Sequence, residues 1–207
     1  MSDHLLEVEN LSIRFHSRGK IVDAVKGVSW HLDRGETLAI LGESGSGKSV
    51  SASAVMGLID TPPGEIVSGS IRFDGREILN LPSRAQRELN GSRIAMIFQD
   101  TLAALNPVYT VGHQISESMT AHGVQPDQAR TKALDLLTRV GIPEPERRYH
   151  DYPHQFSGGQ RQRIMIAAAI AMEPDVLIAD EPTSALDVTV QAEILKLLKS
   201  LQAETGM

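Results

Sequence analysis

The sequence predicts an α/β fold whose parallel sheet is interrupted by a helical insertion. Short apolar runs that resemble buried strands alternate along the chain with segments of helical periodicity. Between residues 100 and 155 the character changes, because loops rich in proline, asparagine and histidine flank a single helical stretch over 126–140. Strands that alternate with helices are typical of a parallel sheet, and the changed segment is expected to be the insertion.

The expected elements follow from their apolar patterns. Residues 5–15 alternate like a strand, and 29–32 resume the alternation, whereas 37–41 form a short apolar run that ends at a glycine, as a buried parallel strand does. Later strands are predicted at 70–73 (before an Asp-Gly turn), 94–98 and 176–179. Long helices are predicted at 157–172, where Ser157 is the cap, and at 188–202.

Composition sets limits on function. A chain of 207 residues with 41% hydrophobic and 22% charged residues is typical of one soluble globular domain. The absence of cysteine fits a reducing compartment and excludes cysteine-ligated zinc or iron–sulfur sites within these residues. The net charge of -6 argues against binding nucleic acid by overall electrostatics. Since no apolar stretch approaches a membrane span and no signal peptide is visible, we expect a cytoplasmic chain that reaches membranes through a partner.

A phosphate-binding loop is predicted directly after the apolar run at 37–41. The sequence fits G-x-x-x-x-G-K-[ST], with the residues Gly42, Glu43, Ser44, Gly45, Ser46, Gly47, Lys48 and Ser49. Glycines let backbone N–H groups surround a phosphate, and the following helix adds its positive N-terminal dipole. Lys48 is expected to reach the β- and γ-phosphates, and the hydroxyl of Ser49 to bind Mg²⁺. The alternative is a Gly/Ser-rich turn into a helix, but the full match in this context favours a nucleoside-triphosphate site.

An acidic pair follows the apolar run at 176–179. Parallel strands deliver the groups at their carboxyl ends to the side of the sheet where phosphates bind. Asp180 is then placed to hold Mg²⁺, and Glu181 to polarise the water that attacks the γ-phosphate. Alone, this pattern could equally be an ordinary strand end, but together with the phosphate loop it favours catalysis.

A third motif consists of Phe156, Ser157, Gly158, Gly159 and Gln160. Here the sequence resembles the ABC ATPase family, whose signature reads L-S-G-G-Q, with phenylalanine in place of leucine. Ser157 is a good N-cap, and the two glycines could expose helix N–H groups for a second anion contact. The alternative is a capped helix whose glycines allow close packing.

The resemblance implies a P-loop NTPase core with a mainly parallel sheet, an N-terminal antiparallel β subdomain and a helical insertion. Residues 1–207 would form one ABC ATPase domain, with the helical subdomain at 100–160 inside it. The family has a switch histidine after a later strand, but no histidine follows His154. We therefore expect a C-terminally truncated chain, with that histidine beyond Met207.

Further residues match the family in order. Gln99 resembles the Q-loop glutamine, which senses Mg²⁺ and links to the transmembrane partner. Residues 184–187, ending at Asp187, resemble the D-loop, which in the family crosses the dimer interface. Phe15 matches the aromatic residue that stacks on adenine, although it could equally be a core strand residue. Arg161 and Arg163 are predicted to be solvated helix positions, or else to meet phosphate or a dimer partner.

Finer similarity in three segments, 99–107, 152–163 and 178–191, points to the peptide and nickel importer branch. It implies the ATP-binding and ATP-hydrolysing subunit, or N-terminal half, of an importer of peptides or nickel, with ATP and Mg²⁺. Glu181, Lys48 and Gln99 would be catalytic, and Ser49, Gln99 and Asp180 would hold the metal.

The expected partners are a second ATPase domain (a copy, a paralogue or a fused half), transmembrane permease subunits and, indirectly, a substrate-binding protein. The expected location is the cytoplasmic face of the cell membrane. Two alternatives remain: a soluble ABC ATPase that acts on nucleic acid or in translation, and a nucleotide-binding module without hydrolysis.

Overall fold

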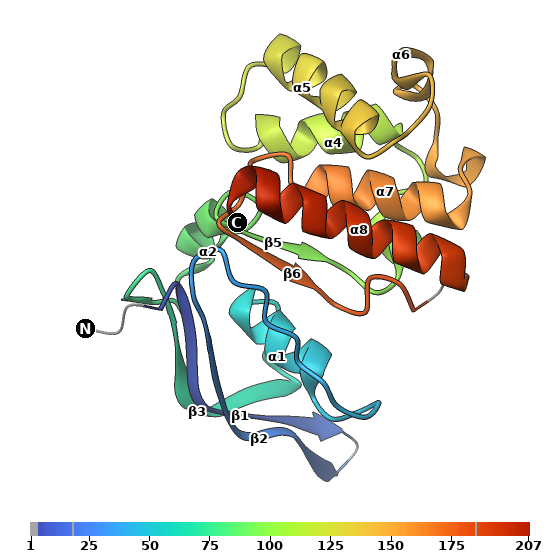
Figure 1. Ribbon diagram of the computed structural model, residues 1–207. Helices are drawn as coiled ribbons and strands as arrows, with labels where there is room; N and C mark the ends of the chain where they lie inside the picture. Colours follow the sequence, from blue (N-terminus) through green and yellow to red (C-terminus); the bar gives the residue numbers. More distant parts are fainter. Residues whose placement is uncertain (1–3, 18, 185) are drawn as a thin grey trace. The chain divides into compact units, whose positions relative to one another are not determined.

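The computed structural model describes residues 4–17, 19–184 and 186–207. The chain divides into two compact units, Met1–Arg87 and Glu88–Met207. The first unit holds a four-stranded sheet and helix α1 (Lys48–Val55), and the second holds two further strands and most of the helices (Figure 1). Helix α2 (Ser83–Leu89) crosses the boundary in the sequence.

The sheet of the first unit is antiparallel throughout. Its strands stand in the order β2-β1-β3-β4, with bounds β1 (Leu6–Ser17), β2 (Lys20–Leu32), β3 (Gly64–Phe73) and β4 (Arg76–Glu77). This confirms the antiparallel β subdomain that the family resemblance implies. The strand predicted at 29–32 is the end of a longer one, because β2 already begins at Lys20 and pairs with β1 along its length.

A β-bulge keeps one face of β1 buried along its length. Val8 lies on an even position and Leu11 and Ile13 on odd positions, yet none is more than 1% exposed. Side chains alternate strictly between the two faces of a regular strand. Val8 and Leu11 can therefore share the buried face only if one extra residue lies between them. Asn10 is that residue, since its φ of 49° is left-handed and the pairing register shifts between Val8 and Leu11. On β3, a Cβ at Gly69 would lie 2.6 Å from the Leu11 Cα, so only glycine fits there.

The prediction of a strand at 37–41 is wrong. In the part of the chain that the structure describes, these residues form no strand and join neither sheet. Their large side chains are exposed, Leu38 by 39%, Ile40 by 48% and Leu41 by 91%. A run of apolar residues becomes a strand only where a neighbour offers a backbone ladder, and neither described sheet pairs with these residues.

Two parallel strands form the sheet of the second unit. Strand β5 (Ile94–Ile97) pairs with β6 (Val176–Ala179), from Ile94 opposite Val176 to Ile97 opposite Ala179. All four residues of β5 are buried, as the continuous apolar runs predict. The observed bounds match the predicted strands, except that β5 ends one residue earlier.

The rest of the second unit is helical. Its helices are α3 (Thr101–Ala104), α4 (Val111–Thr120), α5 (Pro126–Arg139), α6 (Pro145–Arg148), α7 (Gly158–Ala169) and α8 (Val188–Thr205), with a 3₁₀ turn at Pro153–Gln155. Ile115 of α4, Leu137 of α5, Ile166 of α7 and Ile194 of α8 share one buried core with Ile97 of β5. None of the helices among the described residues is long and apolar enough to cross a membrane.

Candidate functional site

The predicted phosphate loop leads directly into α1. Gly47 stands at the N-cap of the helix with φ 93° and ψ 6°, and Gly45 has φ 79°. Both values lie in the region that favours glycine. A Cβ on Gly47 would also come within 2.4 Å of the carbonyl oxygen of Ala24, so steric exclusion adds to the backbone requirement. Left-handed residues interspersed in such a turn aim successive N–H groups to one side, which makes a concavity for an anion.

Lys48 folds back over this loop. Its Nζ donates to the carbonyl oxygens of Gly42, at 2.8 Å, and Glu43, at 3.0 Å. The N–H of Ser46 donates to the same Glu43 carbonyl at 3.2 Å, so the loop also closes on itself. These contacts hold the ammonium group beside the backbone that the sequence assigns to phosphate binding.

The other predicted residues of the first unit lie in the loop, in α1 and in β1. Ser44 occupies an exposed turn of the loop, and Ser49 is half-buried in the first turn of α1. Phe15 is half-buried near the end of β1, opposite Gly64. A Cβ on Gly64 would lie 3.2 Å from Cε1 of Phe15, so the ring covers this glycine. That packing fits a core strand residue, and adenine stacking by Phe15 stays a prediction.

In the second unit, the predicted glutamine and glutamate lie in contact. Because β5 and β6 are parallel, their carboxyl ends lie at one edge of the sheet. Gln99 follows β5 and Glu181 follows β6, and the Nε2 of Gln99 donates to the Oε2 of Glu181 at 2.9 Å. Asp180 is half-buried, and its N–H donates to the carbonyl of Ile97 at 3.0 Å, which extends the β ladder by one residue.

Glu181 has a strained backbone. Its φ of 44° is left-handed, which costs a residue with a side chain on the order of 1–3 kcal/mol. The turn that imposes this conformation is held by Ser184, whose N–H and Oγ both donate to the Glu181 carbonyl at 3.1 Å. Such strain concentrates where a side chain must be aimed, which fits a functional role for the exposed carboxylate.

The signature motif forms the start of α7. Ser157 is the N-cap and makes a capping box with Gln160: the Gln160 N–H donates to Ser157 Oγ at 3.3 Å, and the Ser157 N–H donates to Gln160 Oε1 at 3.0 Å. Phe156 is 4% exposed and anchors the motif in the core. The guanidinium of Arg148 lies 5.1 Å from the centre of its ring, and Arg161 donates to its carbonyl at 3.1 Å.

The two signature glycines differ in their surroundings. A Cβ on Gly159 would lie 2.8 Å from Cγ1 of Val190 on α8, so close packing of α7 against α8 requires glycine. A Cβ on Gly158 would meet only Cδ2 of Leu186, at an ordinary 3.8 Å. Packing therefore accounts for Gly159 without any ligand, whereas it does not account for Gly158.

The predicted D-loop leads into α8. Asp187 caps this helix, its carboxylate accepting a first-turn backbone N–H at 3.1 Å. Gln191, one turn later, donates through Nε2 to the carbonyls of Thr183, at 3.0 Å, and Leu186, at 2.9 Å. The motif's Ala185 lies outside the described residues. This role of Gln191 was not predicted, although a polar residue one turn after a helix cap was the available signal.

The prediction that Arg161 and Arg163 are solvated positions is wrong. Arg163 donates to the carbonyl of Val140 and to the carboxylate of Glu193, both at 2.8 Å, and so ties α7 to α5 and α8. Arg161 donates a hydrogen bond to the carbonyl of Phe156, the first residue of the signature motif. Both guanidinium groups donate hydrogen bonds to backbone carbonyls, and the pattern of charges along the sequence does not indicate such contacts.

Three exposed apolar side chains follow Gln99 in the sequence. Leu102 is 62% exposed, Val108 70% and Tyr109 48%. The loop that carries the last two is fixed by Gln114 of α4, which bonds the backbone N–H and carbonyl of Asn106 and the carbonyl of Tyr109 at 2.8–3.0 Å. Val108 and Tyr109 are therefore presented on a loop held by hydrogen bonds, and Leu102 on α3.

Comparison with known proteins identifies the family. The family model described as ABC transporter matches residues 25–184. The oligopeptide transport ATP-binding protein OppD of Bacillus subtilis is 52% identical over 96% of this chain and 56% of its own length. The peptidoglycan transport ATP-binding protein YejF of Agrobacterium fabrum is 51% identical over 98% of this chain and 37% of its own length. The chain thus spans roughly half of OppD and a smaller share of YejF.

A solved structure gives the same answer at the level of the fold. The ATP-binding cassette MJ0796, solved as a dimer in a post-hydrolysis state bound to ADP and Pi, superposes with a TM-score of 0.85 and 28% identity. The superposition covers 97% of this chain and 84% of that one, so it extends over both units. By its phosphate loop, its signature and these similarities, the chain belongs to the ABC transporter family.

Proposed function

We propose that this chain binds ATP at residues 42–49 and hydrolyses it as a subunit, or N-terminal half, of an ABC importer of peptides. The observation that supports the proposal is the geometry of this loop, where Gly45 and Gly47 have left-handed backbones before α1 and Lys48 donates to the Gly42 carbonyl. Its relatives OppD and YejF are named as transport ATP-binding proteins, and MJ0796 is described as bound to ADP and Pi.

The loop would bind the phosphates of ATP chiefly through its backbone and Lys48. The helix dipole of α1 favours negative charge at Gly47, where no side chain stands in the way. In the present arrangement Lys48 donates to two loop carbonyls. When the β- and γ-phosphates arrive, they offer the ammonium group a charged acceptor, which is a stronger partner than a neutral carbonyl.

The predicted metal ligands fit Mg²⁺. Ser49 offers a hydroxyl, Asp180 a carboxylate and Gln99 an amide oxygen, and oxygen atoms are the ligands that Mg²⁺ prefers. In Gln99 it is the amide nitrogen that donates to Glu181, so the amide oxygen is the atom that would turn to the ion. When bound, the ion would neutralise charge that develops on the β- and γ-phosphate oxygens.

Glu181 is the proposed general base. Its carboxylate would accept a proton from water as the water oxygen bonds to the γ-phosphorus and the bond to the ADP oxygen breaks, which yields ADP and phosphate. The Gln99 hydrogen bond and the strained turn after β6 both restrain the direction of this carboxylate. We propose that they position it before the nucleotide arrives.

A second ATPase domain would complete the site. MJ0796 is described as dimeric, and in such a pair Ser157, Gly158, Gly159 and Gln160 of one domain would close over the γ-phosphate held by the other. The capping box leaves the N-terminus of α7 well ordered, and Gly158 has room to approach a ligand. Asp187 would act at the same interface. The partner domain would be a copy, a paralogue or a fused half; the length of YejF fits a fused half.

The proposed permease contact consists of the exposed side chains of Leu102, Val108 and Tyr109. Its position in the sequence just after Gln99 would let the permease sense the nucleotide site, with residues 100–160 acting as a helical subdomain. The chain would then work at the cytoplasmic face of the membrane, and a substrate-binding protein would deliver the peptide. The net charge of -6 and the transport names of the relatives favour this assignment over a nucleic-acid ATPase.

The test is the affinity for a fluorescent ATP analogue in Lys48→Ala, with Lys20→Ala as the matched control in the same unit. Because a hydrogen bond to a charged group contributes about 1.5–3 kcal/mol, the Lys48 variant should bind about 10- to 100-fold more weakly. Lys20 is exposed at the start of β2, and its variant should bind as the wild type does. Unchanged affinity in Lys48→Ala would contradict the assignment of the loop.

A further inference from the structure

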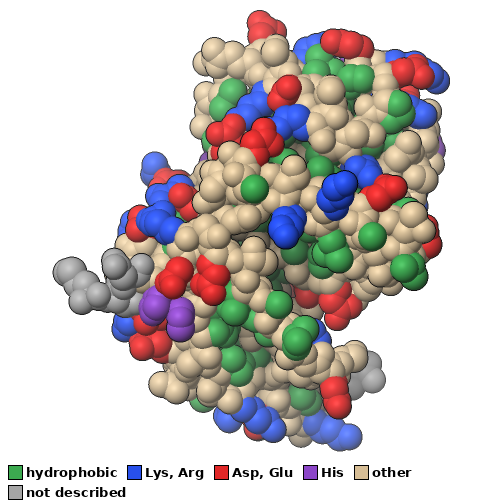
Figure 2. Space-filling model, viewed as in Figure 1, with side chains coloured by type: hydrophobic (Ala, Val, Ile, Leu, Met, Phe, Trp, Pro, Cys, Tyr) green, Lys and Arg blue, Asp and Glu red, His purple; other side chains and the backbone are tan. Residues whose placement is uncertain are grey.

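Three side chains with metal-binding chemistry gather at one end of the N-terminal sheet. They are His4, just before β1, together with His31 and Asp33, at the end of β2. The backbone holds these segments together, because the Leu5 N–H donates to the Leu32 carbonyl at 2.9 Å. Figure 2 shows histidine side chains beside acidic ones on this unit (purple and red, lower left).

The contacts among the three are close. Nδ1 of His4 lies 2.5 Å from Oδ1 of Asp33, and the rings of His4 and His31 stack with centroids 3.9 Å apart and planes 25° from parallel. One possible ligand atom from each residue lies within 4.8 Å of the other two. His31 and Asp33 stand two positions apart at the end of one strand, and such positions share a face of the sheet.

This set matches the coordination chemistry of divalent transition metals. Two imidazoles and one carboxylate form an N,N,O set, which suits Zn²⁺ and its neighbours in the first row and not Mg²⁺ or Ca²⁺. Metal–nitrogen bonds of about 2.0–2.1 Å put tetrahedral ligands about 3.3 Å apart, so the His4 and His31 rings would have to turn out of their stack for a nitrogen of each to face one ion. His31 and Asp33 are exposed and His4 half-buried, which leaves room for the rotations and for water as a fourth ligand.

The surroundings carry negative charge. The Asp33 N–H donates to Oε2 of Glu36 at 2.8 Å, which holds a second carboxylate in this turn. Asp74 is tied to the same region, since its N–H donates to the Leu5 carbonyl at 2.8 Å. Arg34 is the positive charge in this turn, but it pairs with Asp74 at 2.7 Å and is balanced by that carboxylate. The remaining negative charges therefore favour a cation here.

We propose that His4, His31 and Asp33 bind one divalent transition-metal ion, separately from the proposed nucleotide site. The ion would join the entry of β1 to the exit of β2, the two longest strands of the first unit. It would therefore stabilise this sheet as well as occupy the site, since binding to the folded state alone raises stability.

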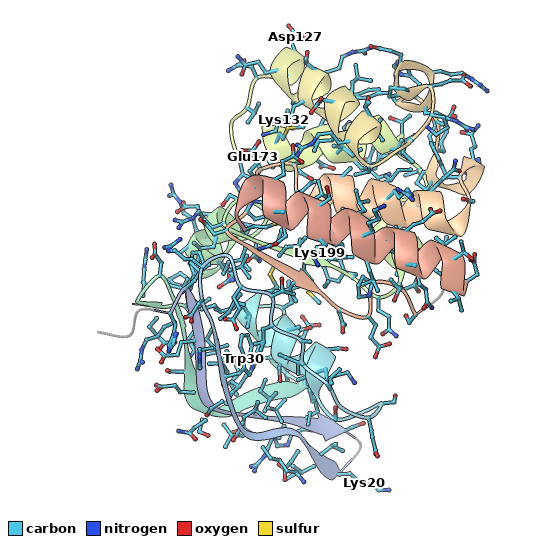
Figure 3. The ribbon with its side chains drawn as sticks, viewed as in Figure 1. Lys20, Trp30, Asp127, Lys132, Glu173 and Lys199 are labelled. Atoms are coloured by element: carbon cyan, nitrogen blue, oxygen red, sulfur yellow. The ribbon has the colours of Figure 1, made fainter. Side chains whose placement is uncertain are left out.

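The test uses the untagged 207-residue chain with Zn²⁺ and Co²⁺ as probes. Zinc is titrated calorimetrically, and cobalt binding is followed through quenching of Trp30, the one tryptophan of the sequence and the residue before His31 (Figure 3). One equivalent of Zn²⁺ should bind and raise the melting temperature. His4→Ala, His31→Ala and Asp33→Asn should each weaken binding by about tenfold or more and remove most of the thermal shift, as loss of a ligand does at other metal sites.

The matched control is His16→Ala. His16 lies on the same sheet and pairs with Glu65 at 2.9 Å, so this variant also removes one histidine from a histidine–carboxylate pair. It should bind Zn²⁺ as the wild type does. Circular dichroism without metal establishes that each variant is folded, and His31→Gln replaces His31→Ala if the latter is not. The proposal is overturned if no Zn²⁺ binds, or if only His4→Ala weakens binding while His31 and Asp33 variants match the wild type.

Discussion

Gly45 and Gly47 allow two contributions to the stability of the phosphate loop to be separated. Both have a positive φ, 79° and 93°, so alanine at either position meets a left-handed backbone that costs about 1–2 kcal/mol. Only at Gly47 would the new Cβ also collide with the Ala24 carbonyl oxygen, at 2.4 Å; around Gly45 nothing lies within 4 Å. Overpacking of this kind costs about 1–3 kcal/mol more. Gly45→Ala should therefore destabilise by about 1–2 kcal/mol and Gly47→Ala by about 2–5 kcal/mol.

Urea unfolding measures this difference. Trp30 lies on β2, the strand that also carries Ala24, so its fluorescence reports on the unit concerned. The lower unfolded-state entropy of alanine affects both variants alike and cancels in their comparison. Gly47→Ala should have the lower midpoint, with an unchanged slope. Equal midpoints for the two variants would refute the argument that Gly47 is fixed by contact with β2 as well as by its backbone.

Two further predictions concern the second unit. Gly159→Ala should destabilise by about 1–3 kcal/mol, because its Cβ would lie 2.8 Å from Val190, and Val190→Ala should restore part of the loss. Gly158→Ala is the control, and chemical denaturation should show a smaller effect. The hydrogen bond and charge of Lys132 lower the pKa of Glu173 below its ordinary 4.5 (Figure 3). This exposed pair should therefore contribute about 0.2–1 kcal/mol above pH 4.5, lost as pH falls through the folded-state pKa. The unfolding free energy of Lys132→Met should lack that part of the acid dependence.

The sequence predicts local features of this protein well. The turn before α1 agrees with its motif, because Gly45 and Gly47 have the positive φ that glycine permits. The bounds of β6 and the start of α8 also match the prediction, since both are marked by strong local signals: an apolar tetrapeptide, and Asp187 as a helix cap.

Features that depend on a partner in space were missed or wrong. Residues 37–41 have the composition of a buried strand but find no ladder among the described sheets. Asn10 carries a bulge that a simple alternation of side chains cannot anticipate. The Gln99–Glu181 hydrogen bond joins residues far apart in sequence, and only the parallel register of β5 and β6 brings them together.

The two glycines of the signature motif have different structural explanations. Close packing accounts for Gly159, which is required by Val190, whereas anion contact stays a prediction for Gly158, which has space beside it. Ser157 and Gln160 bond each other, so any contact with a phosphate would have to compete with the capping box or use the backbone N–H groups beside it. We therefore expect Gly158 to be the more informative position for ligand contact.

We expect Glu181 to activate water for ATP hydrolysis, and the MgATPase rate of Glu181→Gln tests this role most directly. The measurement uses the full-length protein in the assembled transporter, with ATP binding followed in parallel. Glutamine keeps an oxygen that can accept from Gln99 but cannot take up the proton, so the fold and ATP binding should persist. The predicted result is retained ATP affinity with a hydrolysis rate lower by about 10²-fold or more. A variant that hydrolyses ATP at the wild-type rate would contradict the account.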